Sequence, residues 1–280
     1  NTDLRKIPAI VGGDMSKRHG VVLAKSMSAA RYGIRTGEPI TDALRKCASL
    51  TIVPPEHHYY SVCSHQLLDL LHHYTPSISQ YSIDECFAEY VPVPGDNGDP
   101  VKAAHIIKDV IRNKLGFTVN VGISTNRLLA KMASDFEKPD KVHTLFAGEI
   151  REKMWPLPVR DLLFLGKASE QKLIKAGIKT IGEMARYPET EIQRLLGEKT
   201  GHQLYEYANG RDDSPVRGER EEAKGYSAET TTEEDIVTYE QAFSLLLAQC
   251  DVVAARMRKD GKKCSCVSVT YRMLDFRTRS

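Results

Sequence analysis

Two adjacent carboxylates, Asp84 and Glu85, stand inside a run of residues otherwise suited to a buried strand. Ile83, Cys86 and Phe87 supply apolar bulk and strand propensity, whereas acidic side chains are depleted in strands and costly to bury without a partner. A divalent cation would neutralise both acids, because such ions prefer oxygen ligands. The alternative is an exposed edge strand with solvated acids. The residues alone leave both interpretations open.

The segment YSIDECF at 81–87 resembles the catalytic signature S-(I/L)-D-E-(A/C) of the Y-family translesion DNA polymerases, most of all their bacterial ImpB/MucB/SamB, UmuC-like branch. Two further blocks of that family occur in compatible order: VGIS at 121–124 with LAKMASD at 129–135 and KP at 138–139, and LAKS at 23–26 with YGI at 32–34 and GEP at 37–39. The second half of the chain is similar to the family mainly in its layout.

This resemblance implies a right-hand polymerase architecture, with an α/β palm and fingers, an all-α helix-hairpin-helix thumb and a partial α+β little-finger domain. The patterns agree, because strands and helices alternate up to about residue 145 and the chain then becomes all-helical to residue 210. The expected parts are fingers with a palm strand at 1–56, palm at 57–145, thumb at 146–212, a linker at 213–223 and the partial little finger at 224–280.

Hydrophobic periodicity and turn residues place the individual elements. Strands are predicted at 7–13, 20–24, 51–53, across the carboxylates, and at 87–93, 118–123, 224–232 and 264–273. Helices are predicted at 26–32, 40–48, 59–74, 103–115, 126–136 and 238–259, besides those of the thumb.

In the family, nucleotidyl transfer joins a primer hydroxyl to a deoxynucleoside triphosphate with the help of two divalent ions, expected to be Mg²⁺. The resemblance makes Asp84 and Glu85 catalytic metal ligands. Successive strand residues point to opposite faces, so both can serve one site only at a twisted strand end or a bulge. The resemblance places the third acid and the aromatic steric gate before Asn1. The 280-residue chain alone is therefore expected to be inactive, as part of an active full-length enzyme.

The resemblance also assigns a triphosphate contact to Lys138, whose ammonium suits a phosphate as a point charge. Lys131, earlier in the same block, could be structural. The family often has a tyrosine and a basic residue in the fingers, where this chain has Met27 and Ala30. The remaining candidates for nucleotide binding near them are Lys25, Ser26 and Arg31.

Two regions are candidates for DNA binding. The family's thumb hairpin P-G-x-G is replaced by Leu163-Phe164-Leu165-Gly166, so Gly166 and the adjacent Lys167 are the expected phosphate contacts. The segment from Asp251 to Ser280 contains eight basic residues and three acidic ones, although the net charge of the chain is only +2. This excess predicts a DNA-binding face, with a solvated helix surface as the alternative. Its candidate contacts are Arg256, Lys259, Lys262 and Lys263.

Composition narrows the class of protein. The chain has 280 residues, 41% of them hydrophobic, which favours two or more compact units. Its six cysteines form no C-x-x-C pair, which favours free thiols in a reducing cytoplasm. No apolar run reaches membrane-spanning length. The expected partners are primer-template DNA, a deoxynucleoside triphosphate and a sliding clamp, with no membrane.

The function predicted is template-directed, low-fidelity DNA synthesis across lesions, in DNA repair and the SOS response. One alternative is a non-catalytic, polymerase-like protein that binds DNA, which the substitutions Met27, Ala30 and Phe164 favour and the Asp84-Glu85 pair opposes. A second is a palm-fold nucleotide cyclase, suggested by the tripeptide Gly12-Gly13-Asp14 but lacking the Glu-Phe that should follow it.

Overall fold

The computed structural model describes residues 3–13, 20–216, 223–273, 275 and 277–280. They fall into two compact units, the first formed by Asn1–Glu56 with Glu221–Ser280 and the second by His57–Arg220. Asp14, from the cyclase-like tripeptide, and residues 217–222 of the predicted linker lie outside the described residues.

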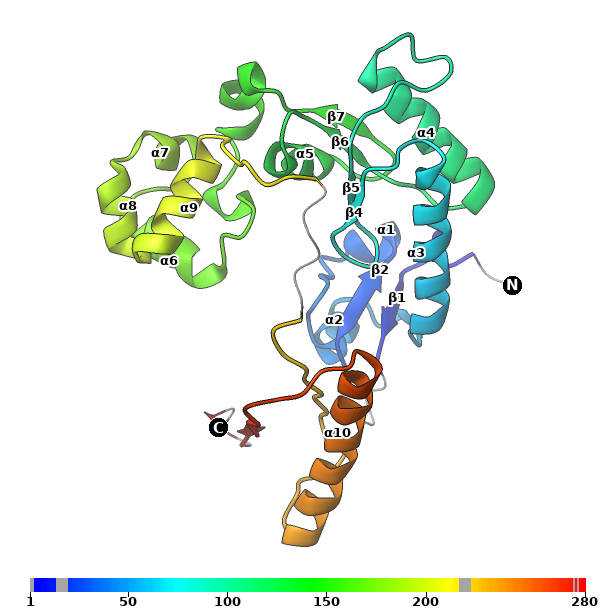
Figure 1. Ribbon diagram of the computed structural model, residues 1–280, viewed down its shortest axis with the longest axis vertical. Helices are drawn as coiled ribbons and strands as arrows, with labels where there is room; N and C mark the ends of the chain where they lie inside the picture. The colour runs from blue at the N-terminus through cyan, green and yellow to red at the C-terminus, as the bar shows by residue number, and fades with distance from the viewer. Residues whose placement is uncertain (1–2, 14–19, 217–222, 274, 276) are drawn as a thin grey trace. The chain divides into compact units, whose positions relative to one another are not determined.

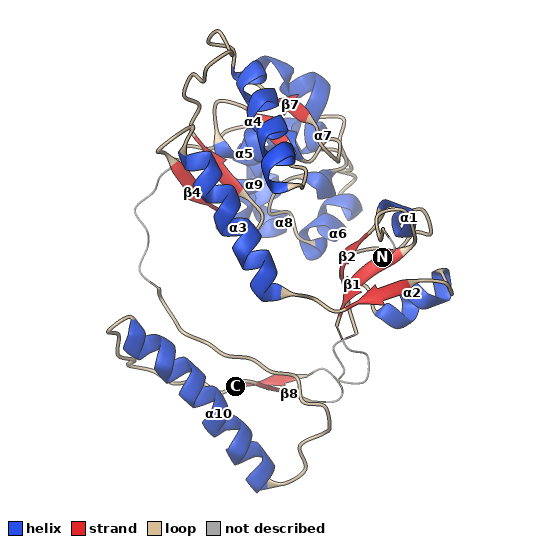
Figure 2. Ribbon diagram, turned by 90° about the vertical axis from the view of Figure 1, so that its right-hand side faces the viewer, coloured by secondary structure: helices blue, strands red, loops and turns tan. Residues whose placement is uncertain are grey.

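The N-terminal segment forms a three-stranded sheet with β1 (Ala9–Gly12) in the middle. β2 (Val22–Lys25) is antiparallel to it and β3 (Thr51–Val53) is parallel. Helices α1 (Met27–Ala30) and α2 (Ile40–Lys46) share a core with the sheet (Figure 2). The elements predicted at 7–53 are confirmed. The core comprises Ile10, Val22, Ala29, Ile34, Ile40, Ala43, Cys47 and Leu50.

The second unit begins with α3 (His57–His72), the antiparallel hairpin of β4 (Ile78–Gln80) and β5 (Cys86–Ala88), and α4 (Pro100–Leu115). Helix α3 packs against both α4 and β4 (Figure 1). Helix α4 begins three residues before the predicted start. Proline at its first position has no N–H group, so no donor is left unsatisfied there. The side chain of the preceding aspartate accepts hydrogen bonds from the next two amides.

The prediction of a strand across the carboxylates is wrong, because Asp84 and Glu85 lie in the turn between β4 and β5. Pairing ends where Gln80 faces Cys86. The Glu85 carbonyl then accepts hydrogen bonds from the amides of residues 81 and 82, at 2.9 and 3.0 Å, and closes the turn. A turn leaves both carboxylates accessible, so the burial cost that an acidic strand would carry does not arise.

A second parallel pair, β6 (Val121–Ile123) with β7 (Val142–Thr144), packs against α5 (Arg127–Ser134). Gly122 permits this close packing, because a Cβ there would lie 1.9 Å from the carbonyl oxygen of Ala130. Helix α5 begins after Asn126, whose side-chain oxygen accepts a hydrogen bond from an amide of the first turn. The strand predicted from residue 118 starts three residues later, at Val121.

The all-helical region predicted from 147 to 210 is confirmed (Figures 1 and 2). One hydrophobic core joins it to α5, through Leu128, Leu129 and Met132. The indole of Trp155 donates a 3.1 Å hydrogen bond to the carbonyl of Ala208 within this region. Its elements are η2 (Ala147–Glu149), η3 (Ile150–Met154), η4 (Val159–Asp161), α6 (Lys167–Lys175), α7 (Ile181–Arg186), α8 (Glu189–Leu196) and α9 (Glu198–Ala208).

The C-terminal segment contains α10 (Tyr239–Lys259) and a short antiparallel pair, β8 (Tyr271–Arg272) with β9 (Thr278–Arg279). The predicted helix is confirmed, but no strand forms at 224–232 and the strand predicted at 264–273 shrinks to two residues. A strand needs a paired neighbouring strand, and of these two segments only Tyr271–Arg272 pairs with another strand among the described residues. None of the described helices is long and apolar enough to cross a bilayer.

Candidate active site and DNA interface

Four charged side chains connect the carboxylate turn to the end of α5. The ammonium of Lys131 lies 2.7 Å from Oε1 of Glu85 and 2.7 Å from Oδ2 of Asp135. The other oxygen of Asp135 lies 2.7 Å from the ammonium of Lys138. The structure thus brings two predicted site residues, Glu85 and Lys138, into one chain of ion pairs.

Lys131 is the least exposed member of this chain, with 14% of its side chain accessible. Burial opposes its charge, but hydrogen bonds to Asp135 and Glu85 outweigh that cost and raise its pKa. Burial likewise opposes the charge of Asp135, while Lys131 and Lys138 together lower the pKa of that carboxyl. The contacts within the network therefore favour the charged forms of Lys131 and Asp135.

Asp84 lies exposed in the same turn, and its carboxylate is held by a residue two positions earlier. The hydroxyl of Ser82 donates a 2.6 Å hydrogen bond to Oδ1 of Asp84. One oxygen of Asp84 and one of Glu85 thus have a protein partner, and the second oxygen of each has no partner among the described residues.

The donor set of this turn fits a hard divalent cation. Among the described residues no cluster of three or more His, Cys, Asp or Glu side chains could hold a metal ion, so the site offers two acids. Mg²⁺ is commonly held by one or two carboxylates together with substrate phosphates and water. Two carboxylates with one unpartnered oxygen each meet that requirement.

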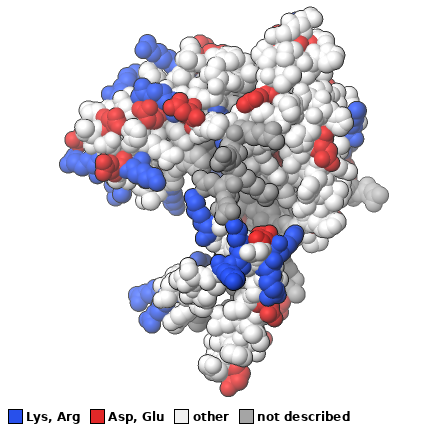
Figure 3. All heavy atoms as spheres, in the orientation of Figure 1, with Lys and Arg blue, Asp and Glu red and all other residues white. Residues whose placement is uncertain are grey.

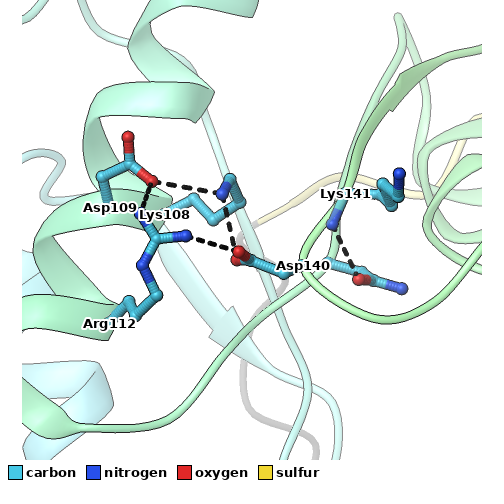
Figure 4. A network of polar contacts seen from close by, with 6 residues as sticks. Lys108, Asp109, Arg112, Asp140 and Lys141 are labelled. Carbon is cyan, nitrogen blue, oxygen red and sulfur yellow. Dashed lines mark hydrogen bonds and ion pairs between the residues drawn. The ribbon is translucent and has the colours of Figure 1, made fainter.

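The segment that carries Lys138 is clamped from both sides. Asp140, two residues later, accepts hydrogen bonds from Lys108 at 3.0 Å and Arg112 at 2.5 Å, both on α4 (Figure 4). On the other side, Asn120 donates to the carbonyls of residues 134 and 137 and accepts from the amide of Lys141. These contacts fix the backbone on either side of Lys138.

Replacing Asp140 with asparagine should flatten the acid dependence of stability. Lys108 above all, and Arg112, hold the pKa of Asp140 below its ordinary value of 3.8. Its stabilising contribution is therefore complete above that value and is lost as the pH falls through the lowered pKa. Fluorescence of Trp155, the one tryptophan of the chain, should report thermal unfolding of this unit between pH 2 and 7. Asp161→Asn, at an exposed acid, is the control; equal acid dependence in D140N and wild type would contradict the assignment.

The fingers candidates lie in the first unit. Lys25 ends β2 and Arg31 follows α1, and both side chains are exposed. The hydroxyl of Ser26 donates to the carbonyl of residue 7 at 2.8 Å and accepts from the amides of residues 9 and 29. Its hydrogen-bonding capacity is used, so the structure favours a structural role for Ser26 over the nucleotide contact predicted from the sequence.

The hairpin candidates for DNA binding lie at the start of α6. Gly166 is the N-cap and makes no side-chain cap, and Lys167 is the first helical residue. Both are exposed. The N–H groups of a first turn without a side-chain cap are available to an anion.

Basic side chains gather over the C-terminal end of α10 (Figure 3). Arg256 donates a 2.9 Å hydrogen bond to the carbonyl of Ser227, so part of its guanidinium has a partner within the chain. Lys259 ends the helix, and Lys262 and Lys263 follow it on the exposed surface.

Similarity to known proteins extends over nearly the whole length of this chain. Family profiles match at three places, the impB/mucB/samB family at residues 1–135, the DNA polymerase-iota thumb domain at 160–212 and the impB/mucB/samB C-terminal domain at 223–280. DNA polymerase IV of Clostridium acetobutylicum is 46% identical over 280 residues, which cover 99% of this chain and 70% of that protein. The chain belongs to the Y family of DNA polymerases.

Other Y-family proteins agree with this membership. DNA polymerase IV of Alkaliphilus oremlandii is 36% identical, over 99% of this chain and 70% of that protein. A Y-family DNA polymerase chimera superposes with a TM-score of 0.81 at 20% identity, over 98% of this chain and 79% of the other, which shows the fold. DinB from Sulfolobus solfataricus superposes with a TM-score of 0.68 at 25% identity, over 76% of this chain and 62% of the other.

The Y-family fold confirms the predicted architecture of palm, fingers, helical thumb and little finger. The exact divisions within it, among them the palm–thumb boundary at residue 146, stay predictions. Sequence reasoning missed Asp135, which joins Lys131 to Lys138. Its spacing held the signal, because residues four and three apart on a helix and its end are neighbours.

Proposed function

We propose that Asp84 and Glu85 are the catalytic acids of this translesion DNA polymerase, which copies DNA past damaged bases. The observation that carries the proposal is the turn between β4 and β5, which presents both acids beside an ion-pair chain that ends at Lys138. Repair of damaged DNA in the SOS response and a sliding clamp as partner belong to the same proposal.

Asp84 and Glu85 would hold Mg²⁺, two ions being expected for this reaction, through their unpartnered oxygens. When bound, the metal would lower the pKa of the primer hydroxyl and offset charge on the leaving pyrophosphate. Ser82 and Lys131 would each hold one oxygen of an acid and so limit the rotation of its carboxylate. This leaves less motion to be lost when the reactants assemble.

Lys138 would bind the triphosphate. Its side chain is 59% exposed and its backbone is clamped, so the ammonium can leave Asp135 for a phosphate without disturbing the fold. Lys25 and Arg31 would assist from the fingers, where Met27 occupies the first position of α1 and cannot pair with a phosphate.

The thumb hairpin and the basic end of α10 would grip phosphates rather than base edges, giving binding that depends on salt and not on sequence. The proposed contacts are Gly166, Lys167, Arg256, Lys259, Lys262 and Lys263.

A non-catalytic role in DNA binding is the second candidate, favoured by the exposed Met27 in the fingers. Primer extension by the full-length protein on a template with an abasic site separates the two. The proposed function predicts Mg²⁺-dependent extension past the lesion, with misincorporation. DNA binding without extension on damaged and undamaged templates would favour the second candidate.

Lys138→Ala in the full-length enzyme should raise the apparent KM for nucleotide by about tenfold, because it removes one charge-assisted phosphate contact of roughly 1.5 kcal/mol. DNA affinity should stay near wild type. Steady-state single-nucleotide insertion measures the first quantity and fluorescence anisotropy the second. Lys141→Ala is the matched control, since Lys141 also pairs with an acid, Glu137, but belongs to no proposed site. Equal KM values for the two variants would remove Lys138 from the nucleotide site.

A further inference from the structure

The thumb hairpin holds an aromatic residue in a backbone conformation that aromatic residues rarely adopt. Phe164 has φ +64°, in the left-handed region. The other described non-glycine residues with positive φ are Asn97 and Asp140, whose short polar side chains tolerate it. A bulky side chain at such an angle is strained, and glycine would adopt the angle without that cost.

The core determines this conformation. Leu162 and Leu165, on either side of the hairpin, are 2% and 9% exposed and belong to the core of the second unit. The amide of Leu165 donates a 3.1 Å hydrogen bond to the carbonyl of Leu162, which closes the turn. With both leucines buried, the residue after Leu163 has to reverse the chain and adopts the left-handed angle.

The ring of Phe164 gains little from the fold in return. It is 60% exposed, and its ring centroid lies 6.2 Å from that of Tyr207 in a tilted arrangement. Glycine at this position would avoid both the strain and the exposure of an apolar ring to water. Backbone strain and an exposed aromatic group at one residue are the features expected of a functional contact rather than of packing.

The surroundings of Phe164 indicate what its ring contacts. Two residues later, Gly166 opens α6 with first-turn amides free of any side-chain cap, and the exposed Lys167 follows. A phosphate bound there would place the neighbouring deoxyribose, the apolar part of the backbone, beside the hairpin. The bases of a duplex are stacked and unavailable to such a ring. Resting on the proposed function, we propose that Phe164 packs against a deoxyribose of bound DNA and adds affinity that does not depend on salt.

The test is the binding of a fluorescent primer-template duplex to the 280-residue chain, by anisotropy across a series of KCl concentrations. Phe164→Ala should weaken binding about five- to tenfold, as expected for the loss of a few tens of Å² of apolar contact. The slope of log affinity against log salt should stay unchanged, because no phosphate contact is lost. Lys167→Gln should weaken binding and also lower that slope by about one. Ile174→Ala, at an exposed apolar residue of α6, should bind like wild type.

Phe164→Gly separates the ring from the backbone. It should bind as weakly as F164A but unfold at a higher temperature than F164A, by Trp155 fluorescence, because glycine relieves the left-handed strain that alanine keeps. Wild-type affinity in both variants, or tighter binding by F164G, would overturn the inference while leaving the proposed function intact. A wild-type chain that binds no duplex DNA would overturn both. Weakened binding with a lowered salt slope in F164A would make Phe164 a support for phosphate contacts instead, and would also overturn it.

Discussion

Replacing Asp84 or Glu85 with alanine in the full-length polymerase should lower the rate of primer extension by about a thousandfold or more. Each substitution removes one of the two carboxylates that the turn presents, and the described residues offer no third acid to replace it. The turn is exposed and outside the described cores, so the fold should persist. Binding of primer-template DNA should change less than twofold, because the proposed phosphate contacts lie in the thumb hairpin and at the end of α10 and not in this turn.

Single-turnover extension and anisotropy measure the two quantities. Asp84→Asn and Glu85→Gln, which keep shape and remove charge, should be nearly as inactive as the alanine variants. Glu89→Gln is the matched control, since Glu89 is an exposed acid just after β5 in the same hairpin. An E85Q enzyme as active as E89Q would show that Glu85 serves only to pair with Lys131.

The second large effect is expected at Lys131. Lys131→Met should lower the rate of extension by about ten- to a hundredfold and the free energy of unfolding by about 1–2 kcal/mol. The substitution keeps the aliphatic volume but leaves Glu85 and Asp135, whose side chains are 35% and 45% exposed, without their shared cation. Glu85 then loses the group that fixes its orientation, and Asp135 retains Lys138 more tightly.

Lys141→Met tests whether position rather than charge is responsible, because Lys141 also forms an i,i+4 ion pair, with Glu137. Urea unfolding by Trp155 fluorescence gives the stability, and rapid-quench extension gives the rate. A K131M enzyme that loses stability but keeps wild-type extension would make Lys131 a purely structural residue. Similar losses in K131M and K141M would show a general effect of net charge.

Much of the fold could be predicted because its signals are local. Asn126 caps α5 and Gly33 follows α1 with a positive φ, and both signals are visible in the sequence. The misplaced strand at 81–87 has a different origin. Alternating apolar residues show which side chains can pair, but the last hydrogen-bonded pair, Gln80 with Cys86, depends on where the chain reverses.

The candidate site was predictable only in part. The types of Asp84, Glu85 and Lys138 point to metal and phosphate, but the contact of Lys131 with Glu85 spans 46 residues and depends on how α5 packs on β6. No local spacing encodes such a contact. The strain at Phe164 was equally out of reach, since a dihedral angle follows from the burial of its neighbours.

The hydrophobic core that joins α5 to the helices of residues 147–210 has a mechanical consequence. Leu128 and Met132 of α5 pack in the same close-packed interior as Leu173 of α6. A helix packed into such an interior moves together with it as one rigid body. A force that bound DNA exerts on the hairpin before α6 would therefore be transmitted to α5, and through Lys131 to the carboxylate turn.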